Sequence, residues 1–287
     1  MNASELLQQV RKIEIKTRGL SKQIFAGEYQ SAFKGRGMTF SEVREYQYGD
    51  DIRNIDWNVT ARFNKPYVKV FEEERELTVM LIIDVSGSRE FGTAVRQKQA
   101  LIAELSAVLS FSAIQNNDKV GVIMFSDKVE KFIPPKKGRQ HILRIIRELI
   151  DFQPEDRGTD IAAAVRYFTN VTKKRCTAFL ISDFMSAPFL DDLRLAARKH
   201  DMIALRIYDR RETELPAIGL VQMKDAETGQ IRYVDTSSRQ VREAYRRYWE
   251  ECQREIDDTF MHCGIDNIFI RTDEDYVKPL VKLFKQR

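Results

Sequence analysis

Short runs of apolar residues alternate with stretches of helical periodicity through most of the chain. The clearest run, Leu77 to Ile83, is apolar nearly throughout, as expected of a strand that is buried on both faces of a sheet. Apolar residues then recur at helical spacing between Thr93 and about Gln115, which predicts a helix. Repetition of this alternation predicts a mostly parallel α/β sheet with helices on both faces, because parallel strands need helical crossovers. The other parallel strands expected are Val120 to Phe125, Thr177 to Ile181, Ile203 to Tyr208 and Ile265 to Ile270.

Three further segments complete this part of the chain. Val129 to Ile133 is expected to form an antiparallel edge strand that ends before Pro134 and Pro135, because proline cannot donate to a sheet ladder. A hairpin is expected over 218–234, followed by a long charged helix from about Ser238 to Met261. An apolar stripe on that helix indicates core packing, and docking of a partner is the alternative. The stripe consists of Tyr245, Trp249, Cys252, Ile256 and Phe260.

The beginning of the chain follows a different pattern, with one helical segment near Ser4 to Ile15 and then a stretch rich in glycine and aromatic residues. We therefore expect a smaller N-terminal segment, residues 1–75, and an α/β domain, residues 76–287, with the hairpin and long helix inserted at about 212–262. Within the N-terminal segment, Gly49 to Trp57 places mixed charges around an aromatic residue. That pattern is typical of an internal salt-bridge network, although ligand binding is the alternative.

Composition narrows the class of protein. With 287 residues and 43% hydrophobic content, the chain can bury a sizeable core. It contains no apolar run of about 18 residues that could span a membrane, and its first residues lack the pattern of a signal peptide. The cysteines Cys176, Cys252 and Cys263 are odd in number and form no CxxC pair, which is typical of a reducing compartment. We therefore expect a cytoplasmic protein with no membrane span.

Charge and histidine content argue against a nucleic-acid-binding protein and against a histidine-based zinc hydrolase. The net charge is +4, but lysine and arginine are interleaved with nearly as many acidic residues, so a solvated mixed surface is expected in place of specific nucleic-acid binding. The histidines His141, His200 and His262 are scattered along the chain. That spacing argues against a histidine-based zinc hydrolase.

The strongest candidate for chemistry follows the clearest strand. Asp84, Ser86 and Ser88 occupy alternate positions directly after it, where an extended loop directs alternate side chains to one side. Two more oxygen-bearing residues, Thr159 and Asp183, stand before a predicted helix and after a predicted strand. Right-handed crossovers bring both to the same edge of the sheet. Oxygen ligands without cysteine or histidine favour Mg²⁺, with Mn²⁺ or Ca²⁺ as alternatives.

This series resembles the metal-ion-dependent adhesion site of von Willebrand factor A domains, over about Leu77 to Arg287. The resemblance implies that Ser86, Ser88 and Thr159 bind the metal directly and that Asp84 and Asp183 act partly through water. It also implies one open coordination position for an acidic side chain of a protein partner. The sequence has Arg89 where related sequences usually have methionine, which places a cation near the rim of the site.

A second resemblance covers the N-terminal segment. Its motifs are Gly35 to Phe40, Val43 to Tyr46, Gly49 to Trp57 and Thr60 to Arg62. They resemble the bacterial family called domain of unknown function 58, in which such a segment precedes a von Willebrand factor A-like domain. Members are often encoded beside a MoxR-type AAA+ ATPase, so the resemblance implies a non-enzymatic adaptor that engages that ATPase or its target.

Alternatives remain at individual positions and for the whole site. Thr159 is a natural N-cap for the helix that follows it, and the serines can serve only to satisfy a loop backbone. An Mg²⁺-dependent hydrolase or phosphotransferase would use Asp84 as its nucleophile. Against that enzyme, the second position after Asp84 is Ser86, which cannot supply the acid or base that a second aspartate would.

Overall fold

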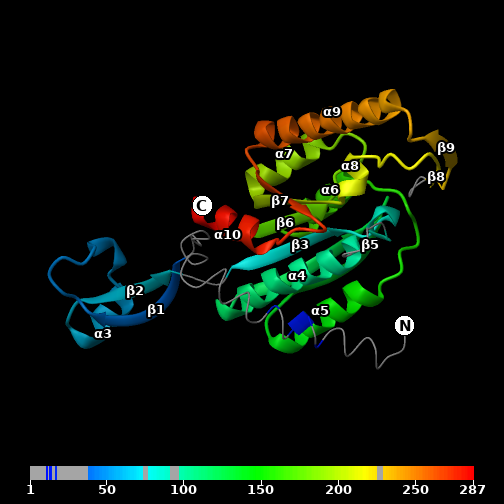
Figure 1. Ribbon diagram of the computed structural model, residues 1–287. Helices are drawn as coiled ribbons and strands as arrows, with labels where there is room; N and C mark the ends of the chain where they lie inside the picture. The colour runs from blue at the N-terminus through cyan, green and yellow to red at the C-terminus, as the bar shows by residue number, and fades with distance from the viewer. Residues whose placement is uncertain are drawn as a thin grey trace. The chain divides into compact units, whose positions relative to one another are not determined.

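A computed structural model describes residues 11, 13, 14, 17, 38–73, 77–90, 97–224 and 229–287 (Figure 1). The chain divides into two compact units. The smaller unit is Phe33–Leu77, and the larger unit joins Thr78–Arg287 with Met1–Ala32. The smaller unit is built on a two-stranded sheet and the larger one on a six-stranded sheet.

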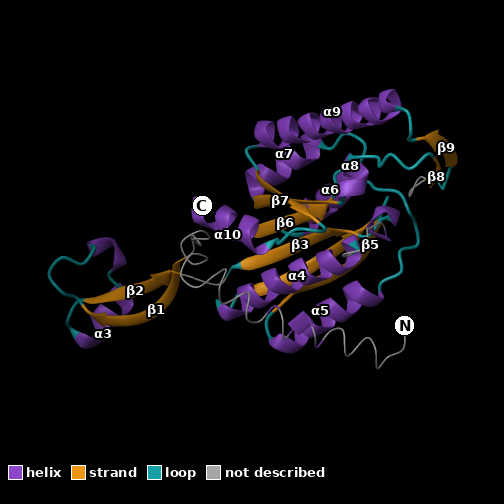
Figure 2. Ribbon diagram, viewed as in Figure 1, coloured by secondary structure: helices purple, strands orange, loops and turns teal. Residues whose placement is uncertain are grey.

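The six-stranded sheet has the strand order β10-β7-β6-β3-β4-β5 (Figure 2). All neighbouring strands are parallel except β5, which runs antiparallel to β4 at the edge. The predicted mostly parallel α/β sheet and its antiparallel edge strand are confirmed. The strands are β3 (Thr78–Asp84), β4 (Lys119–Phe125), β5 (Val129–Lys136), β6 (Thr177–Ser182), β7 (Asp201–Tyr208) and β10 (Asp266–Arg271).

Helices cover both faces of this sheet (Figure 1). On one face, α4 packs beside α5, and on the other α7 lies between α6 and α9. The C-terminal helix α10 meets β6 through the rings of Phe179 and Phe284, whose centroids are 6.4 Å apart. The helices are α4 (Lys98–Gln115), α5 (Arg139–Asp151), α6 (Ile161–Val171), α7 (Leu190–Lys199), α8 (Arg210–Thr213), α9 (Arg239–Cys263) and α10 (Val277–Gln286).

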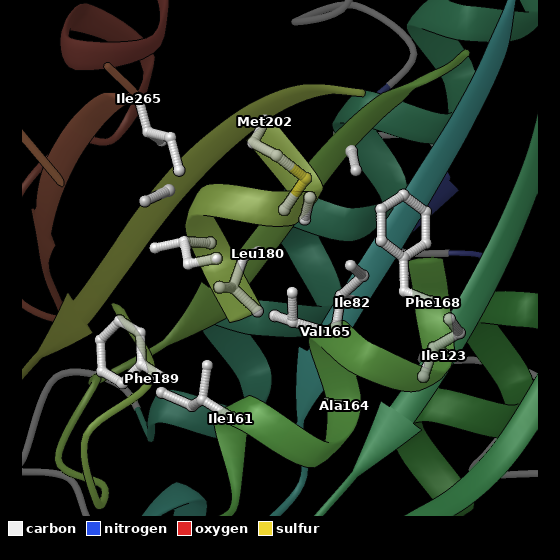
Figure 3. Packing of buried hydrophobic residues seen from close by; sticks show 14 of the residues in the cluster. Ile82, Ile123, Ile161, Ala164, Val165, Phe168, Leu180, Phe189, Met202 and Ile265 are labelled. Atoms are coloured by element: carbon white, nitrogen blue, oxygen red, sulfur yellow. The ribbon is translucent and has the colours of Figure 1, made fainter. Parts of the chain in front are cut away.

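The core between the sheet and α6, α7 and α9 explains the unbroken apolar runs of the central strands. Every residue of β6 is buried. Leu180 faces α6, where it joins Val165 and the fully buried Phe168 (Figure 3). Its neighbour Phe179 packs on the opposite face against Phe284. A strand covered on both faces has no polar side to show in its sequence.

Two predicted boundaries were wrong. The edge strand β5 continues through Pro134 and Pro135 to Lys136, because its pairing with β4 shifts register between Val120 and Val122, and proline is tolerated at such an irregularity of an edge strand. Gly121 allows this edge to approach closely, since a Cβ there would lie 3.0 Å from the Pro135 nitrogen. The helix predicted from Thr93 begins at Lys98, and residues 91–96 lie outside the described part of the chain.

The predicted hairpin and long helix are present. Strands β8 (Leu220–Lys224) and β9 (Ile231–Asp235) pair antiparallel, and α9 follows them. On the apolar stripe of α9, Trp249, Ile256 and Phe260 are buried. The structure therefore confirms that this stripe belongs to the core.

The smaller unit holds the mixed-charge segment. Strands β1 (Met38–Glu45) and β2 (Tyr67–Glu73) pair antiparallel, and the 3-10 helix η1 (Ile52–Asn54) and helix α3 (Trp57–Phe63) connect them. Both terminal guanidinium nitrogens of Arg44 donate to Asp50 at 2.8 Å. Asp56 accepts two backbone N–H groups at the start of α3 and pairs with Lys69 at 3.5 Å. Two acidic residues of the predicted charge network, Asp50 and Asp56, therefore have partners on the flanking strands, whereas the aromatic residue of that segment, Trp57, is exposed.

The N-terminal residues group with the larger unit, whereas the sequence division placed residues 1–75 together. A contact between residues that are far apart in the sequence explains this grouping, because the Arg139 Nε of α5 donates to Glu14 Oε1 at 2.6 Å. The other boundary, between Leu77 and Thr78, lies close to the predicted one at 75/76. Most of the helix expected near Ser4 to Ile15, and Gly35 to Gly37 of the family motif, lie outside the described residues.

Candidate metal centre

The predicted ligands gather where loops meet at the carboxyl edge of the six-stranded sheet. Asp84 ends β3 and Asp183 follows β6, and these strands are parallel neighbours. Parallel neighbours end at the same edge, so the two carboxylates occupy adjoining strand ends. Ser182 links the two ends, because its hydroxyl donates to Asp84 Oδ2 at 2.6 Å.

Asp84 organises the loop that follows β3. Its Oδ1 accepts the Ser86 N–H at 2.9 Å, and its side chain is almost completely buried. Ser86 is fully buried, and its hydroxyl oxygen lies 3.2 Å from that of Ser88. The alternate positions read from the sequence therefore do bring two hydroxyls together. The side chain of Arg89 lies outside the described residues.

Thr159 lies in a loop that is joined to the loops on either side of it. The Gly87 N–H donates to the Arg157 carbonyl at 3.0 Å, which ties this loop to the one after β3. The Ser186 hydroxyl donates to the Thr159 carbonyl at 3.0 Å, which ties it to the loop after β6. The three loops that carry the predicted ligands are thus in direct contact.

The N-cap of α6 is Asp160, not Thr159. The Asp160 carboxylate accepts the Ala163 N–H at 2.8 Å, the usual capping hydrogen bond. Asp160, and not Thr159, therefore caps this helix.

A buried lysine, absent from the sequence prediction, stands against the candidate site. Lys98 begins α4 and is 2% exposed. Its ammonium lies 3.0 Å from Asp183 Oδ2 and 2.5 Å from Glu212 Oε1 of α8. The sequence does contain one signal, because Lys98 lies three residues before Leu101 on the apolar stripe of its helix, where a charge needs a buried partner.

Burial and neighbouring charges set the protonation of these groups. Burial raises the pKa of Asp84 to about 6, and the negative charge of Asp183 adds to the rise. Burial also opposes ionisation of Asp183, but the Lys98 ammonium outweighs it, so the pKa of Asp183 is lowered. Burial disfavours the Lys98 ammonium, but Asp183 and Glu212 outweigh it, and the pKa of Lys98 is raised. Asp183 and Lys98 are therefore an ion pair.

The donor set fits a hard divalent cation. Among the described residues no salt bridge reaches Asp84, while Asp183 and Glu212 share the single ammonium of Lys98, so the group has an excess of negative charge. Within the described ranges no three His, Cys, Asp or Glu side chains could hold a metal by themselves. A cation here would therefore depend on the hydroxyls of Ser86, Ser88 and Thr159, which are ligands of the kind that Mg²⁺ accepts.

The larger unit is an α/β domain built on a mostly parallel six-stranded sheet, and a smaller unit accompanies it in the chain. The chain belongs to the family described as "Protein of unknown function DUF58", whose model matches residues 42–255. "Uncharacterized protein Rv1480" of Mycobacterium tuberculosis is 29% identical over 286 residues, which cover 99% of this chain and 90% of that protein. "Uncharacterized protein YeaD" of Bacillus subtilis is 28% identical over 109 residues, 38% of this chain and 25% of that one.

Three solved structures are similar to this chain, and the first of them shares its fold. The conserved hypothetical protein BatB from Bacteroides thetaiotaomicron has a TM-score of 0.50 and 15% identity, covering 73% of this chain and 98% of that chain. An aerotolerance-related membrane protein from Bacteroides fragilis has a TM-score of 0.49 and 17% identity, and the match covers 73% of this chain and 97% of that chain. The SpRpn10 VWA domain has a TM-score of 0.38 and 12% identity, and the match covers 74% of this chain and 95% of that chain.

The predicted cytoplasmic location is contradicted by this comparison. The neighbours include the aerotolerance-related membrane protein and an uncharacterized membrane spanning protein from Vibrio fischeri. The features behind the prediction, unpaired cysteines and a lack of long apolar runs, describe the folded domain and do not fix its compartment. In the parts of the chain that the structure describes, none of the helices has both the length and the apolar composition needed to cross a membrane.

Proposed function

We propose that this protein is a non-enzymatic interaction module that binds a protein partner through a divalent metal ion. The observation that carries the proposal is the convergence of Asp84, Ser86, Ser88 and Asp183 at the carboxyl edge of the sheet, with Thr159 in a loop bonded to both neighbouring loops. This edge is where open α/β sheets bind ligands.

Each residue has a distinct part in the proposed site. The hydroxyls of Ser86, Ser88 and Thr159 would hold Mg²⁺ directly, with Mn²⁺ or Ca²⁺ as alternatives. Asp84 and Asp183 would act partly through water, since each already accepts other hydrogen bonds. The bound cation would supply an electrophile for a carboxylate, and an acidic side chain of the partner would provide it.

The geometry of Asp84 weighs against the alternative hydrolase or phosphotransferase. A nucleophilic carboxylate needs an accessible oxygen. In Asp84, Oδ1 accepts the Ser86 N–H, Oδ2 accepts the Ser182 hydroxyl, and the side chain is 4% exposed. This environment suits a group that orients a loop and stabilises a cation.

The family resemblance suggests the partner. We propose a MoxR-type AAA+ ATPase, or the target of that ATPase, with assembly or maturation of a protein complex as the process served. Co-purification of the chain with the MoxR-type ATPase of the same organism, with Mg²⁺ or with EDTA, tests this step. Binding that persists unchanged in EDTA would contradict metal dependence, and no binding in Mg²⁺ would remove this partner.

The metal itself is tested by calorimetric titration of the EDTA-treated protein with Mg²⁺ and Mn²⁺. We expect one saturable site in the wild type and no binding in Ser86→Ala, because that change removes a direct ligand. Ser110→Ala is the matched control, since Ser110 is an equally buried serine within α4. Equal binding by wild type and Ser86→Ala would refute the proposed site.

A further inference from the structure

Lys98 places a permanent positive charge inside the candidate metal centre. Its ammonium is 3.0 Å from Asp183 Oδ2, within a group of side chains that are almost fully buried. A charge this close to a ligand carboxylate acts on any second cation at the site, because the surrounding protein screens it far less than water does.

The same ammonium has a second carboxylate within reach. It lies 2.5 Å from Glu212 Oε1, while Glu212 Oε2 accepts the Asp209 N–H at 2.8 Å and so holds the start of α8. Asp209 in turn accepts the Thr272 hydroxyl at 2.5 Å. Glu212 is therefore a fixed partner that can retain the ammonium when Asp183 turns toward another cation.

We propose that Lys98 is the resident cation of this centre and competes with a divalent metal ion for Asp183, a proposal that rests on the proposed function. Without metal, the ammonium compensates the Asp183 carboxylate and keeps the centre folded. With metal bound, Asp183 is shared between the Lys98 ammonium and the metal ion. Repulsion between these two cations keeps the affinity of the centre for the metal low. A carboxylate from the partner adds the missing negative charge, so metal and partner bind together more tightly than either binds alone.

The test compares the wild type with Lys98→Met, which keeps the length of the side chain and removes its charge, and with Lys98→Arg, which keeps the charge. Mn²⁺ is titrated into each EDTA-treated protein by calorimetry, and the melting temperature is measured with and without Mn²⁺. We expect Lys98→Met to bind Mn²⁺ about tenfold or more tighter than the wild type, because a nearby like charge is removed. It should melt lower than the wild type in EDTA and recover in Mn²⁺, whereas Lys98→Arg should keep the wild-type affinity.

The outcomes separate this inference from the function on which it rests. In one outcome Lys98→Met binds Mn²⁺ and the wild type does not, even with free glutamate added. This result would support the role of Lys98 as resident cation and refute the proposed metal-dependent function. Affinity in Lys98→Met equal to or weaker than that of the wild type would overturn the competition. If Lys98→Met does not fold, Lys98→Gln replaces it, because its amide can still donate to both carboxylates, and the same criterion applies.

Discussion

Replacing Asp84 with asparagine should stabilise the metal-free protein above pH 6. Asparagine has nearly the shape of aspartate, and its amide oxygen can still accept the Ser86 N–H that Asp84 Oδ1 accepts. Ser182, whose hydroxyl donates to Asp84 Oδ2, would turn to accept the new amide N–H instead. The substitution therefore removes a buried charge with little change in packing.

The magnitude follows from the pKa of Asp84, which burial and the charge of Asp183 raise from 3.8 to about 6. A carboxyl group whose pKa is higher in the folded than in the unfolded protein holds its proton more tightly when folded. Its contribution to stability is therefore lost as the pH rises from about 4 through about 6. One pKa unit corresponds to about 1.4 kcal/mol, so ionisation of Asp84 lowers the free energy of unfolding by about 3 kcal/mol. The asparagine variant avoids this loss.

The assay is urea denaturation followed by circular dichroism in EDTA, at pH values between 4 and 8. The difference in free energy of unfolding between Asp84→Asn and the wild type should be small at pH 4 and reach about 2–3 kcal/mol in favour of the variant at pH 8. Asp191→Asn is the control, because its carboxylate is 92% exposed, and it should show no comparable gain in stability at pH 8. A variant that is less stable than the wild type at pH 8, or a difference that does not change with pH, would refute the reasoning.

Two further predictions concern the rest of the larger unit. Gly121→Ala should lower the free energy of unfolding by about 1–3 kcal/mol in urea, because the new Cβ would lie 2.7 Å from Met80 Sδ and 3.1 Å from the Ile133 carbonyl oxygen of the edge strand. A loss below about 0.5 kcal/mol would mean that the edge strand shifts freely to make room. Cys176 should resist a thiol reagent at pH 8 in the native protein, because burial raises its pKa to about 12, while the partly exposed Cys252 and Cys263 react first. Peptide mapping gives the labelling rate of each cysteine, and equal rates at the three cysteines would contradict this prediction.

Much of the sheet could be predicted from the sequence because strands that are buried on both faces appear as continuous apolar runs. The strand residues of β3 and β6 have to be apolar on both sides, so each appears as a continuous run between polar loops. The same reasoning located Asp84 and Asp183, since residues that follow neighbouring parallel strands must meet at one edge. That these positions share an edge depends on the parallel direction of the strands, which the alternating pattern of strands and helices predicts.

Details that depend on one residue of register were decided by local geometry. Thr159 and Asp160 can both cap a helix, and only the backbone of the folded loop selects Asp160. Pro134 and Pro135 would end most strands, but here they fall at a shift of register on the edge strand, and the strand continues. Sequence rules for such residues describe preferences that the surrounding structure can override.

By itself, then, the amino-acid sequence determined the layers of the larger unit and the edge at which its acidic and hydroxyl side chains collect. Only the tertiary structure decided which charges compensate one another there. Lys98 of α4, Asp183 of the loop after β6 and Glu212 of α8 are far apart in the sequence and meet only when α4 and α8 pack at the sheet edge. A charged side chain is normally solvated, and removing it from water is favourable only if partners that are distant in sequence arrive at hydrogen-bonding distance. That condition is a property of the folded chain and leaves little trace in the local pattern of residues.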